Sequence, residues 1–419
     1  MAKEFRPGVD RVLYAQAVFG EAEVAAVTDC LRQGWLGPGR ITEEFERGVA
    51  QVCGKKFGLF VNSGSTANYV AMEIAGLPRG SEVITQACTF PATLNPIIMH
   101  GHTPVFIDSK VGSYNLDLDQ LEAGIGPKTK AIFISHTLGN VNDLARIREV
   151  CDRRGLLFIE DGCDTLGQRY RGEPTGRWSH ISTASFYAAH HITTAGGGGM
   201  VMTDDPKLIR EAKIFRDWGR ALPENDDENI AERFNFQVGG SDFDGKFTYV
   251  KIALNFKPVE VQAAFGLVQL GRLAEFNRIR RRNIERLTAF FRQYPDTFIL
   301  PETLPDAEVY WISYPLTLQP NCGVVRKDLL TYLEEHHIQT RLVFAGNILH
   351  HPAYAGMQYR LVGDLRQADT IMRQSFLIGC HQGLTDAHVD YLTQTFAAYL
   401  RERGLMPTPA AVRGAAGSV

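Results

Sequence analysis

Residues 57–76 read FGLFVNSGSTANYVAMEIAG, a stretch that contains the unit from which the whole fold is predicted. The apolar run FGLFV comes first, the short polar turn NSGS follows it, and an amphipathic segment completes the stretch. An apolar run of this length is typical of a buried strand, and the spacing of apolar residues after the turn is typical of a helix. The stretch therefore predicts a strand, a turn and a helix, in that order.

Further apolar runs of the same kind recur along the first 205 residues. Most of them are separated by amphipathic stretches, and they lie at 82–87, 103–108, 131–136, 156–161, 182–187 and 199–204. Short apolar runs between helical patterns are typical of βα units that build a buried, largely parallel sheet. We expect an α/β fold whose large domain holds a sheet of about seven strands, most of them parallel.

The pattern changes after Pro258, where residues 259–291 predict one long amphipathic helix. Its four clustered arginines (Arg278, Arg280, Arg281 and Arg282) would suit a nucleic-acid partner if they were considered alone. The chain carries 44 Lys and Arg against 47 Asp and Glu, which gives a net charge of −3. Because there is no basic excess, we interpret the cluster as a solvated helix face and expect no nucleic-acid partner.

The segments after the long helix mix strand-like patterns, at 309–318 and 338–344, with helix-like patterns at 325–337 and 386–404. Such a mixture predicts a smaller α+β domain. The expected division of the chain is a large α/β domain over 1–257, a smaller domain over 258–404 and a disordered tail over 405–419.

The composition is that of a soluble protein of the cytoplasm. The 419 residues are 44% hydrophobic and 22% charged, with a mean hydropathy of −0.14. No apolar run approaches the roughly 18 residues of a membrane span, and the first residues, MAKEFRPGVDR, carry charges where a signal peptide is apolar. The seven cysteines are scattered without a C-x-x-C pair, so we expect neither a disulfide framework nor a thiolate zinc site.

Ligands of open α/β sheets bind at the carboxyl ends of the strands, so residues that follow the predicted strands are the first candidates for a site. Ser63-Gly64-Ser65 opens a helix and would either cradle an anion or form an ordinary capped loop. Asp161, after a buried strand, would either pair with a protonated ring nitrogen or cap a helix. Phe90 would either stack on a planar ring or fill the core.

A fourth strand end, residues 185–194, runs into four consecutive glycines at 196–199. The glycine run lacks the Gly-Lys-Ser/Thr of a phosphate-binding P-loop, and we expect it to let the backbone pass close to a bulky group. His190 and His191 are adjacent, so their side chains should point apart and cannot both bind one metal ion. No other histidine pair has a metal-ligand spacing, and we expect no metal site.

In order and spacing these motifs resemble the sugar aminotransferase family of pyridoxal-phosphate enzymes, the DegT/DnrJ/EryC1/StrS group, from about Gly34 to Leu384. The matching motifs are Ser-Gly-Ser at 63–65, Thr-Phe at 89–90, Glu-Asp at 160–161, Ser-Phe at 185–186, and Asn, Lys and Glu-Val-Gln-Ala-Ala within 255–264. The resemblance implies the fold type I of pyridoxal-phosphate transferases, which is aspartate aminotransferase-like.

The family's Schiff-base lysine falls on His190, five residues after Ser185. An imidazole cannot form the Schiff base that anchors the cofactor, so ordinary transamination is disfavoured. Phe-Tyr-x-x-His-His-Ile-Thr at 186–193 is similar to the family's nucleotide-4-keto-6-deoxyhexose 3-dehydratases. That resemblance implies pyridoxal or pyridoxamine phosphate bound without a covalent link, and removal of the C3 hydroxyl of a nucleotide-linked sugar.

The same resemblance assigns roles to individual residues. His190 would be the acid/base, since its ordinary pKa near 6.5 suits proton transfer at neutral pH, and Asp161 would keep the pyridine nitrogen protonated. Asn255 would reach the cofactor of a neighbouring subunit, which implies a homodimer with shared active sites. The other expected cofactor contacts are Gly64, Ser65, Phe90, Asp164 and Ser185, and the candidate substrate contacts are Arg220, Lys257, Arg341 and Asn347.

Two branches of the subgroup close the catalytic cycle differently. One holds a 2Fe–2S cluster on four cysteines after Asp-Trp-Gly-Arg and takes electrons from a reductase. Here that motif is present at 217–220, but residues 221–250, which we expect to form a long loop, contain no cysteine, so we expect no cluster. We favour the cluster-free branch, in which glutamate is the amino donor. A reductase-assisted dehydratase without its own cluster and a non-catalytic partner of a true family member are the alternatives.

Overall fold

The computed structural model describes residues 4–222 and 230–408. The acidic ENDDEN segment at 224–229 and positions 409–419 of the predicted tail lie outside the described residues. Within the described ranges, no helix combines the length and the apolar character that crossing a membrane requires.

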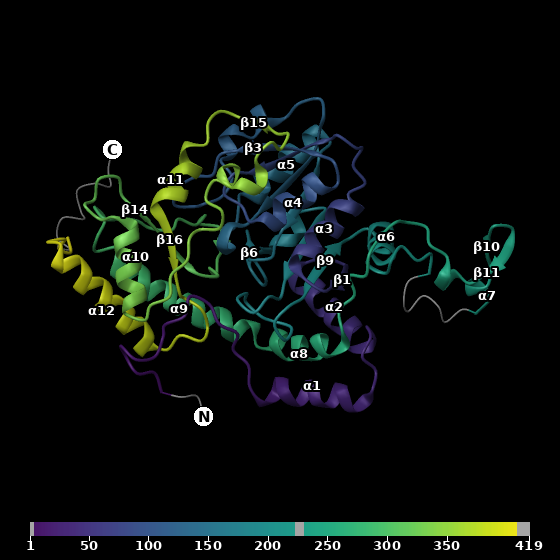
Figure 1. Ribbon diagram of the computed structural model, residues 1–419, viewed down its shortest axis with the longest axis horizontal. Coiled ribbons are helices and arrows are strands. Elements are labelled where there is room, and N and C mark those ends of the chain that lie inside the picture. Colours follow the sequence, from purple (N-terminus) through teal and green to yellow (C-terminus); the bar gives the residue numbers. More distant parts are fainter. Residues whose placement is uncertain (1–3, 223–229, 409–419) are drawn as a thin grey trace.

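The centre of the molecule is an eight-stranded sheet with the order β1-β9-β8-β5-β4-β2-β3-β15 (Figure 1). All seven apolar runs form strands of this sheet: β1 (Phe57–Val61), β2 (Glu82–Gln86), β3 (Thr103–Ile107), β4 (Thr129–Ser135), β5 (Leu157–Asp161), β8 (Ile181–Ser185) and β9 (Gly199–Thr203). Only β9 runs antiparallel to its neighbours, β1 and β8. The expected count of seven was one too low, because β15 (Arg360–Leu361) adds a two-residue strand too short to leave a pattern.

Helices cover both faces of the sheet (Figure 1). Along β4, Phe133 packs in the core under α3 and α6, whereas its neighbours Ile132 and Ile134 pack in the core under α5, as the alternation of a strand requires. The helices of this part are α1 (Glu21–Gln33), α2 (Arg40–Cys53), α3 (Gly64–Ile74), α4 (Pro91–Met99), α5 (Leu144–Arg154) and α6 (Pro206–Arg216).

The predicted long helix is two helices, α8 (Glu260–Gly271) and α9 (Leu273–Phe291). Arg272 between them has a ψ of −3°, outside the helical range, and it follows a glycine of low helix propensity. Because the helix breaks at Arg272, α8 can lie along α1. The Arg272 guanidinium then donates a hydrogen bond to Glu23 of α1 at 3.0 Å. The interpretation of the arginine cluster as a solvated helix face was wrong for one residue. Arg280 is fully buried, whereas Arg278, Arg281 and Arg282 are exposed.

The C-terminal elements surround a second, antiparallel sheet with the order β12-β14-β16 (Figure 1). The predicted strand at 338–344 is wrong, because this stretch makes only isolated bridges, from Ile338 to Val12 and from Arg341 to Leu377.

The division of the chain into domains at residue 257 stays a prediction, and both β15 and Val12 make contacts across it. The elements are β12 (Phe298–Ile299), β14 (Tyr314–Leu318), α10 (Arg326–Glu335), α11 (Arg366–Gln374), β16 (Ser375–Ile378) and α12 (Asp386–Glu402), and a small sheet joins β6 (Arg169–Tyr170), β7 (Glu173–Pro174) and β13 (Ala307–Glu308).

An arm after α6 extends away from the rest of the molecule (Figure 1). Its described part is not the featureless loop that was expected, since it contains α7 (Ile230–Arg233) and a hairpin of β10 (Phe236–Val238) and β11 (Ser241–Phe243). Gly239 and Gly240 form the two-residue turn with φ values of 59° and 82°, which suit the left-handed turn that hairpins prefer.

Candidate active site

A cavity of about 1040 Å³ opens where the carboxyl ends of β4, β5 and β8 meet the start of α3 and α4. Residues of the C-terminal elements, among them Ile312, Ser313 and Phe344, close its other side. Eight of the predicted site residues line this one cavity: Gly64, Ser65, Phe90, Asp161, Asp164, Ser185, His190 and Arg341.

The Ser-Gly-Ser turn lies at the N-terminus of α3, directly against the end of β8. Ser63 caps the helix by accepting a hydrogen bond from the Thr66 backbone N–H at 3.1 Å. A Cβ atom on Gly64 would stand 2.6 Å from the Ser185 Cβ, so only glycine lets the two segments approach this closely. The first N–H groups of a helix have no acceptor within the helix, and the helix dipole favours an anion beside them. The turn, with the Ser65 and Ser185 side chains, therefore suits a phosphate group.

Asp161, at the end of β5, is held by three donors. Its Oδ2 accepts hydrogen bonds from Asn68 Nδ2 and from Thr93 Oγ1, both at 2.6 Å, and its Oδ1 accepts from the Cys163 backbone N–H at 3.2 Å. The residues that follow Asp161 form turns, so the alternative of a helix-capping role is wrong. Asn68 and Thr93 were missed in the sequence, where the only signal was a polar residue on the inner side of an otherwise apolar helix.

The neighbouring carboxylate, Glu160, lies on the other side of the strand and bonds to His136 instead. The two groups are fully buried, with His136 Nε2 at 3.1 Å from Glu160 Oε1. His136 Nδ1 accepts a hydrogen bond from the Asn142 backbone N–H, so Nε2 carries the proton and donates. Burial alone would raise the pKa of Glu160, but the hydrogen bonds from His136 and Ser179 outweigh it and hold the pKa below its usual range.

His190 lies in a turn after β8, where its backbone N–H donates to the Tyr187 carbonyl at 2.9 Å. Its Nδ1 is 3.2 Å from Asp164 Oδ1, and the two side chains are 17% and 12% exposed. At this distance the carboxylate can stabilise a positive charge on the imidazole ring. Asp164 was expected to contact a cofactor; it lines the cavity, and its carboxylate also lies beside His190.

His191 points away from the cavity, as the adjacency of the two histidines predicted. Its Nε2 donates to the Tyr310 carbonyl at 2.6 Å, and its side chain is fully buried. Burial, reinforced by the nearby charge of Arg280, holds the pKa of His191 well below its usual range. His191 therefore stays neutral and belongs to the packing of the loop.

Arg280 is a further residue near the site that was missed in the sequence. It donates to the backbone carbonyls of Trp311 and Ile312, at 3.1 and 2.9 Å, and to that of His190 at 3.4 Å. The guanidinium thus ties the turn that carries His190 to the opposite wall of the cavity. Burial lowers the pKa of Arg280 to about 10, so it remains charged at neutral pH.

Phe90 and Arg341 both face the cavity. Phe90 is 51% exposed and contacts the Phe344 ring edge-on, with 5.6 Å between centroids, so it does not fill the core. The Arg341 guanidinium lies over the Tyr14 ring, 4.7 Å from its centroid. Both residues are placed where a bound ligand would touch them.

Four predicted residues do not line this cavity. Arg220 and Lys257 each lie 4.6 Å from the Trp218 ring, at the base of the arm. Asn255 is there too, paired through its backbone with Asp217. Asn347 is buried, and its amide donates to Asp369 at 2.7 Å, which indicates a structural role.

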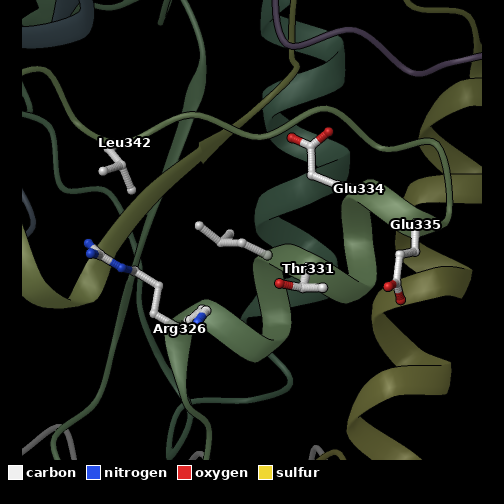
Figure 2. Close-up of a pocket in the computed structure, with 7 residues that line it drawn as sticks. Arg326, Thr331, Glu334, Glu335 and Leu342 are labelled. Atoms are coloured by element: carbon white, nitrogen blue, oxygen red, sulfur yellow. The ribbon is translucent and has the colours of Figure 1, made fainter.

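A second hollow, of about 620 Å³, lies between α10 and Leu342 (Figure 2). Arg326 at one end donates to the carbonyls of Met372 and Ser375, and Glu334 near the other accepts from Thr340. Arg326 and Glu334 already have partners in the chain, and none of the predicted site residues lines this hollow. Among residues 4–222 and 230–408, no three His, Cys, Asp or Glu side chains gather as metal ligands would.

Proteins of known name match nearly the full chain. The chain is 38% identical to the lipopolysaccharide biosynthesis protein RfbH of Salmonella typhimurium, over 95% of this chain and 93% of that protein. It is 35% identical to the dTDP-4-dehydro-2,6-dideoxy-D-glucose 3-dehydratase of Saccharopolyspora spinosa, over 92% of this chain and 85% of that protein. The solved structure of E. coli GDP-4-keto-6-deoxy-D-mannose-3-dehydratase with bound hydrated PLP is similar with a TM-score of 0.84 and 25% identity, over 92% of this chain and 99% of that one.

The similarity in structure to the E. coli enzyme confirms the expected α/β architecture of the type I transferase fold. Residues 18–397, which include the whole eight-stranded sheet, match a single protein family. This chain therefore belongs to the DegT/DnrJ/EryC1/StrS aminotransferase family.

Proposed function

We propose that this protein is a 3-dehydratase that uses pyridoxamine phosphate to remove the C3 hydroxyl of a nucleotide-linked 4-keto-6-deoxyhexose, with glutamate as amino donor. One observation carries the proposal: the position of the family's lysine is His190, whose ring is supported by Asp164 at 3.2 Å. The names of the S. spinosa and E. coli proteins, both sugar 3-dehydratases, support the same reaction.

The residues around the cavity fit the cofactor. The α3 N-terminus with Ser65 and Ser185 would hold the phosphate, and Asp161 would accept a hydrogen bond from the protonated ring nitrogen. Phe90, exposed at the cavity, would lie against the ring. When bound, the cofactor supplies an electron sink that makes loss of the hydroxyl at the sugar's C3 feasible.

In the proposed reaction the protein moves one proton. The His190 ring takes it, and the Asp164 carboxylate, 3.2 Å from Nδ1, stabilises the imidazolium that results. The same imidazolium then gives the proton to the departing oxygen, so that the hydroxyl leaves as water. A lysine could do this only after release from a Schiff base, whereas the imidazole stays free throughout.

We also propose a homodimer, because the segment at the base of the arm exposes a strip of apolar side chains. Over positions 247–254 these are at least 55% exposed, namely Phe247, Tyr249, Val250, Ile252 and Leu254. Contiguous exposed apolar surface of this kind marks an interface. Arg220, Asn255 and Lys257 lie beside the strip and away from their own cavity, so a second copy would bring them to its neighbour's cavity.

Two experiments test these proposals. Incubation with glutamate and with GDP-, CDP- and dTDP-linked 4-keto-6-deoxyhexoses in turn should yield 2-oxoglutarate and a sugar one oxygen lighter by mass spectrometry. Turnover that requires an added reductase would support the reductase-assisted alternative, and no turnover with any sugar would support a non-catalytic partner. For the dimer, mixing inactive His190→Asn and Asn255→Ala chains should restore activity, because one composite site in the mixed dimer keeps both residues.

A further inference from the structure

The Asp161 carboxylate accepts hydrogen bonds from two different helices and from the turn that follows it. Thr93 comes from α4 and Asn68 from α3, and both donate to the same oxygen, Oδ2, at 2.6 Å. Both donors are fully buried, and Asp161 itself is 6% exposed. Donors of this kind to a carboxylate are stronger than neutral hydrogen bonds, so their loss has a measurable effect.

Asn68 is itself held in one orientation. Its Oδ1 accepts a hydrogen bond from Thr183 Oγ1 of β8 at 2.6 Å, and its Nδ2 also donates to the Ala92 carbonyl at 3.1 Å. If the amide were turned over, its oxygen would face the Asp161 carboxylate and its nitrogen would face the Thr183 hydroxyl. The Asp161 carboxylate and the Ala92 carbonyl can only accept, so they fix the amide with its N–H groups toward Asp161, and the Thr183 hydroxyl donates to its oxygen.

The number of acceptor positions on Asp161 then matters. A carboxylate accepts about four hydrogen bonds, two on each oxygen. Oδ2 already has two donors, and Oδ1 has one from the Cys163 backbone N–H. The Cys163 thiol, a weak donor, also interacts with the carboxylate, so the strong donors leave room for a further strong hydrogen bond only on Oδ1, and Asp161 lines the cavity.

We propose that Thr93 and Asn68 are positioning residues that saturate Oδ2 of Asp161 and so direct Oδ1 to the ring nitrogen of the cofactor. This inference rests on the proposed function, since it takes the cofactor to be pyridoxal or pyridoxamine phosphate. Without the Thr93 donor, the carboxylate can rotate and the ring nitrogen meets an acceptor that is no longer fixed. Thr183 acts one step further away, through Asn68.

The test compares Thr93→Val, which keeps the shape and removes the donor, with Thr93→Ser, which keeps the donor. The dissociation constant for pyridoxamine phosphate is measured by fluorescence, and the absorbance of bound pyridoxal phosphate is followed against pH. We expect Thr93→Val to weaken binding about tenfold and to shift the pH profile of the absorbance, and Thr93→Ser to stay within about twofold of the wild type.

Thr317→Val is the matched control, because Thr317 is also fully buried and bonds to Tyr114 and Ser375 at 2.9 and 2.6 Å outside the cavity. It should lower thermal stability without changing binding or the absorbance profile. If Thr93→Val does not fold, Thr183→Val provides the same test with a smaller expected effect in the same direction.

Wild-type binding and a wild-type pH profile in a folded Thr93→Val or Thr183→Val protein would overturn the inference. The proposed function fails separately, because in that case the wild-type protein itself does not bind pyridoxamine phosphate or does not deoxygenate any of the sugars. A loss in Thr93→Val that Thr93→Ser also shows would point to packing, and it too would refute a role for the donor.

Discussion

Replacing Asp164 by asparagine removes a negative charge from beside the proposed base and keeps nearly the same side-chain shape. Asp164 Oδ1 lies 3.2 Å from His190 Nδ1, in surroundings that leave the two side chains only 12% and 17% exposed. The carboxylate would stabilise the imidazolium that forms when His190 takes a proton. An amide has no such charge, so Asp164→Asn should slow turnover and leave cofactor affinity nearly unchanged.

The size of the effect follows from the distance. Two unit charges 3.2 Å apart interact with about 5 kcal/mol at the effective dielectric constant of about 20 that describes groups near a protein surface. If residual solvent contact screens about half of this energy, about 2.5 kcal/mol is lost from the transition state. Since about 1.4 kcal/mol is a factor of ten in rate, we expect kcat to fall roughly 70-fold.

The assay is dehydration of the nucleotide sugar under single-turnover conditions with pyridoxamine phosphate already bound, together with the dissociation constant for that cofactor. Glu73→Gln is the matched control, because Glu73 also contacts a histidine, His100, at 3.3 Å but lies outside the cavity. A fall in kcat of less than about threefold would refute the reasoning. Unchanged kcat with much weaker cofactor binding would instead return Asp164 to the cofactor contact that the sequence predicted.

Three further predictions concern the absence of a covalent link to the cofactor, the turn Ser63-Gly64-Ser65 that would bind its phosphate, and the stability of the protein in acid. Borohydride in the presence of pyridoxal phosphate should leave the mass of every peptide unchanged, and a labelled peptide would contradict the role of His190. Gly64→Ala places a Cβ 2.6 Å from the Ser185 Cβ and should weaken pyridoxamine phosphate binding at least about tenfold by titration, whereas Gly271→Ala, with nothing within 4 Å, should not. Burial, together with the charge of Arg280, lowers the pKa of His381 to about 3, so the unfolded chain binds a proton that the folded chain does not. The free energy of unfolding should therefore fall by up to about 1.4 kcal/mol per pH unit below about pH 6, and urea titrations of His381→Gln should show a shallower fall.

Seven of the eight strands of the sheet could be predicted from the sequence because they are largely buried on both faces and so read as mainly apolar runs. The strand ends could be predicted for the same reason, which is why Asp161 and Ser185, both predicted as site residues, lie together at one cavity. The strand predicted at 338–344 was wrong because its backbone makes only single bridges to two separate segments, although Ile338 and Val343 are buried. The local pattern of apolar residues does not distinguish burial within a sheet from burial against separate segments of the chain.

The residues that support the site could not be predicted from the sequence. Asn68 and Thr93 are far along the chain from Asp161, and only the packing of α3 and α4 on the sheet brings their donors to its carboxylate. The burial of Arg280 could not be predicted, because the three exposed arginines around it made the whole run resemble a solvated helix face. A polar side chain on the inner side of a helix is a signal whose partner is known only once the fold is known.

The turn that carries His190 has a consequence for how such enzymes diversify. Ser185 and Gly199 face each other in the antiparallel pair of β8 and β9, so the segment between them leaves the sheet and returns to it at the same rung. A change of side chain within that segment alters the reactive group without disturbing the hydrogen bonds of the ladder below. A change of one residue in this segment can therefore change the chemistry that the cavity offers while the scaffold stays the same.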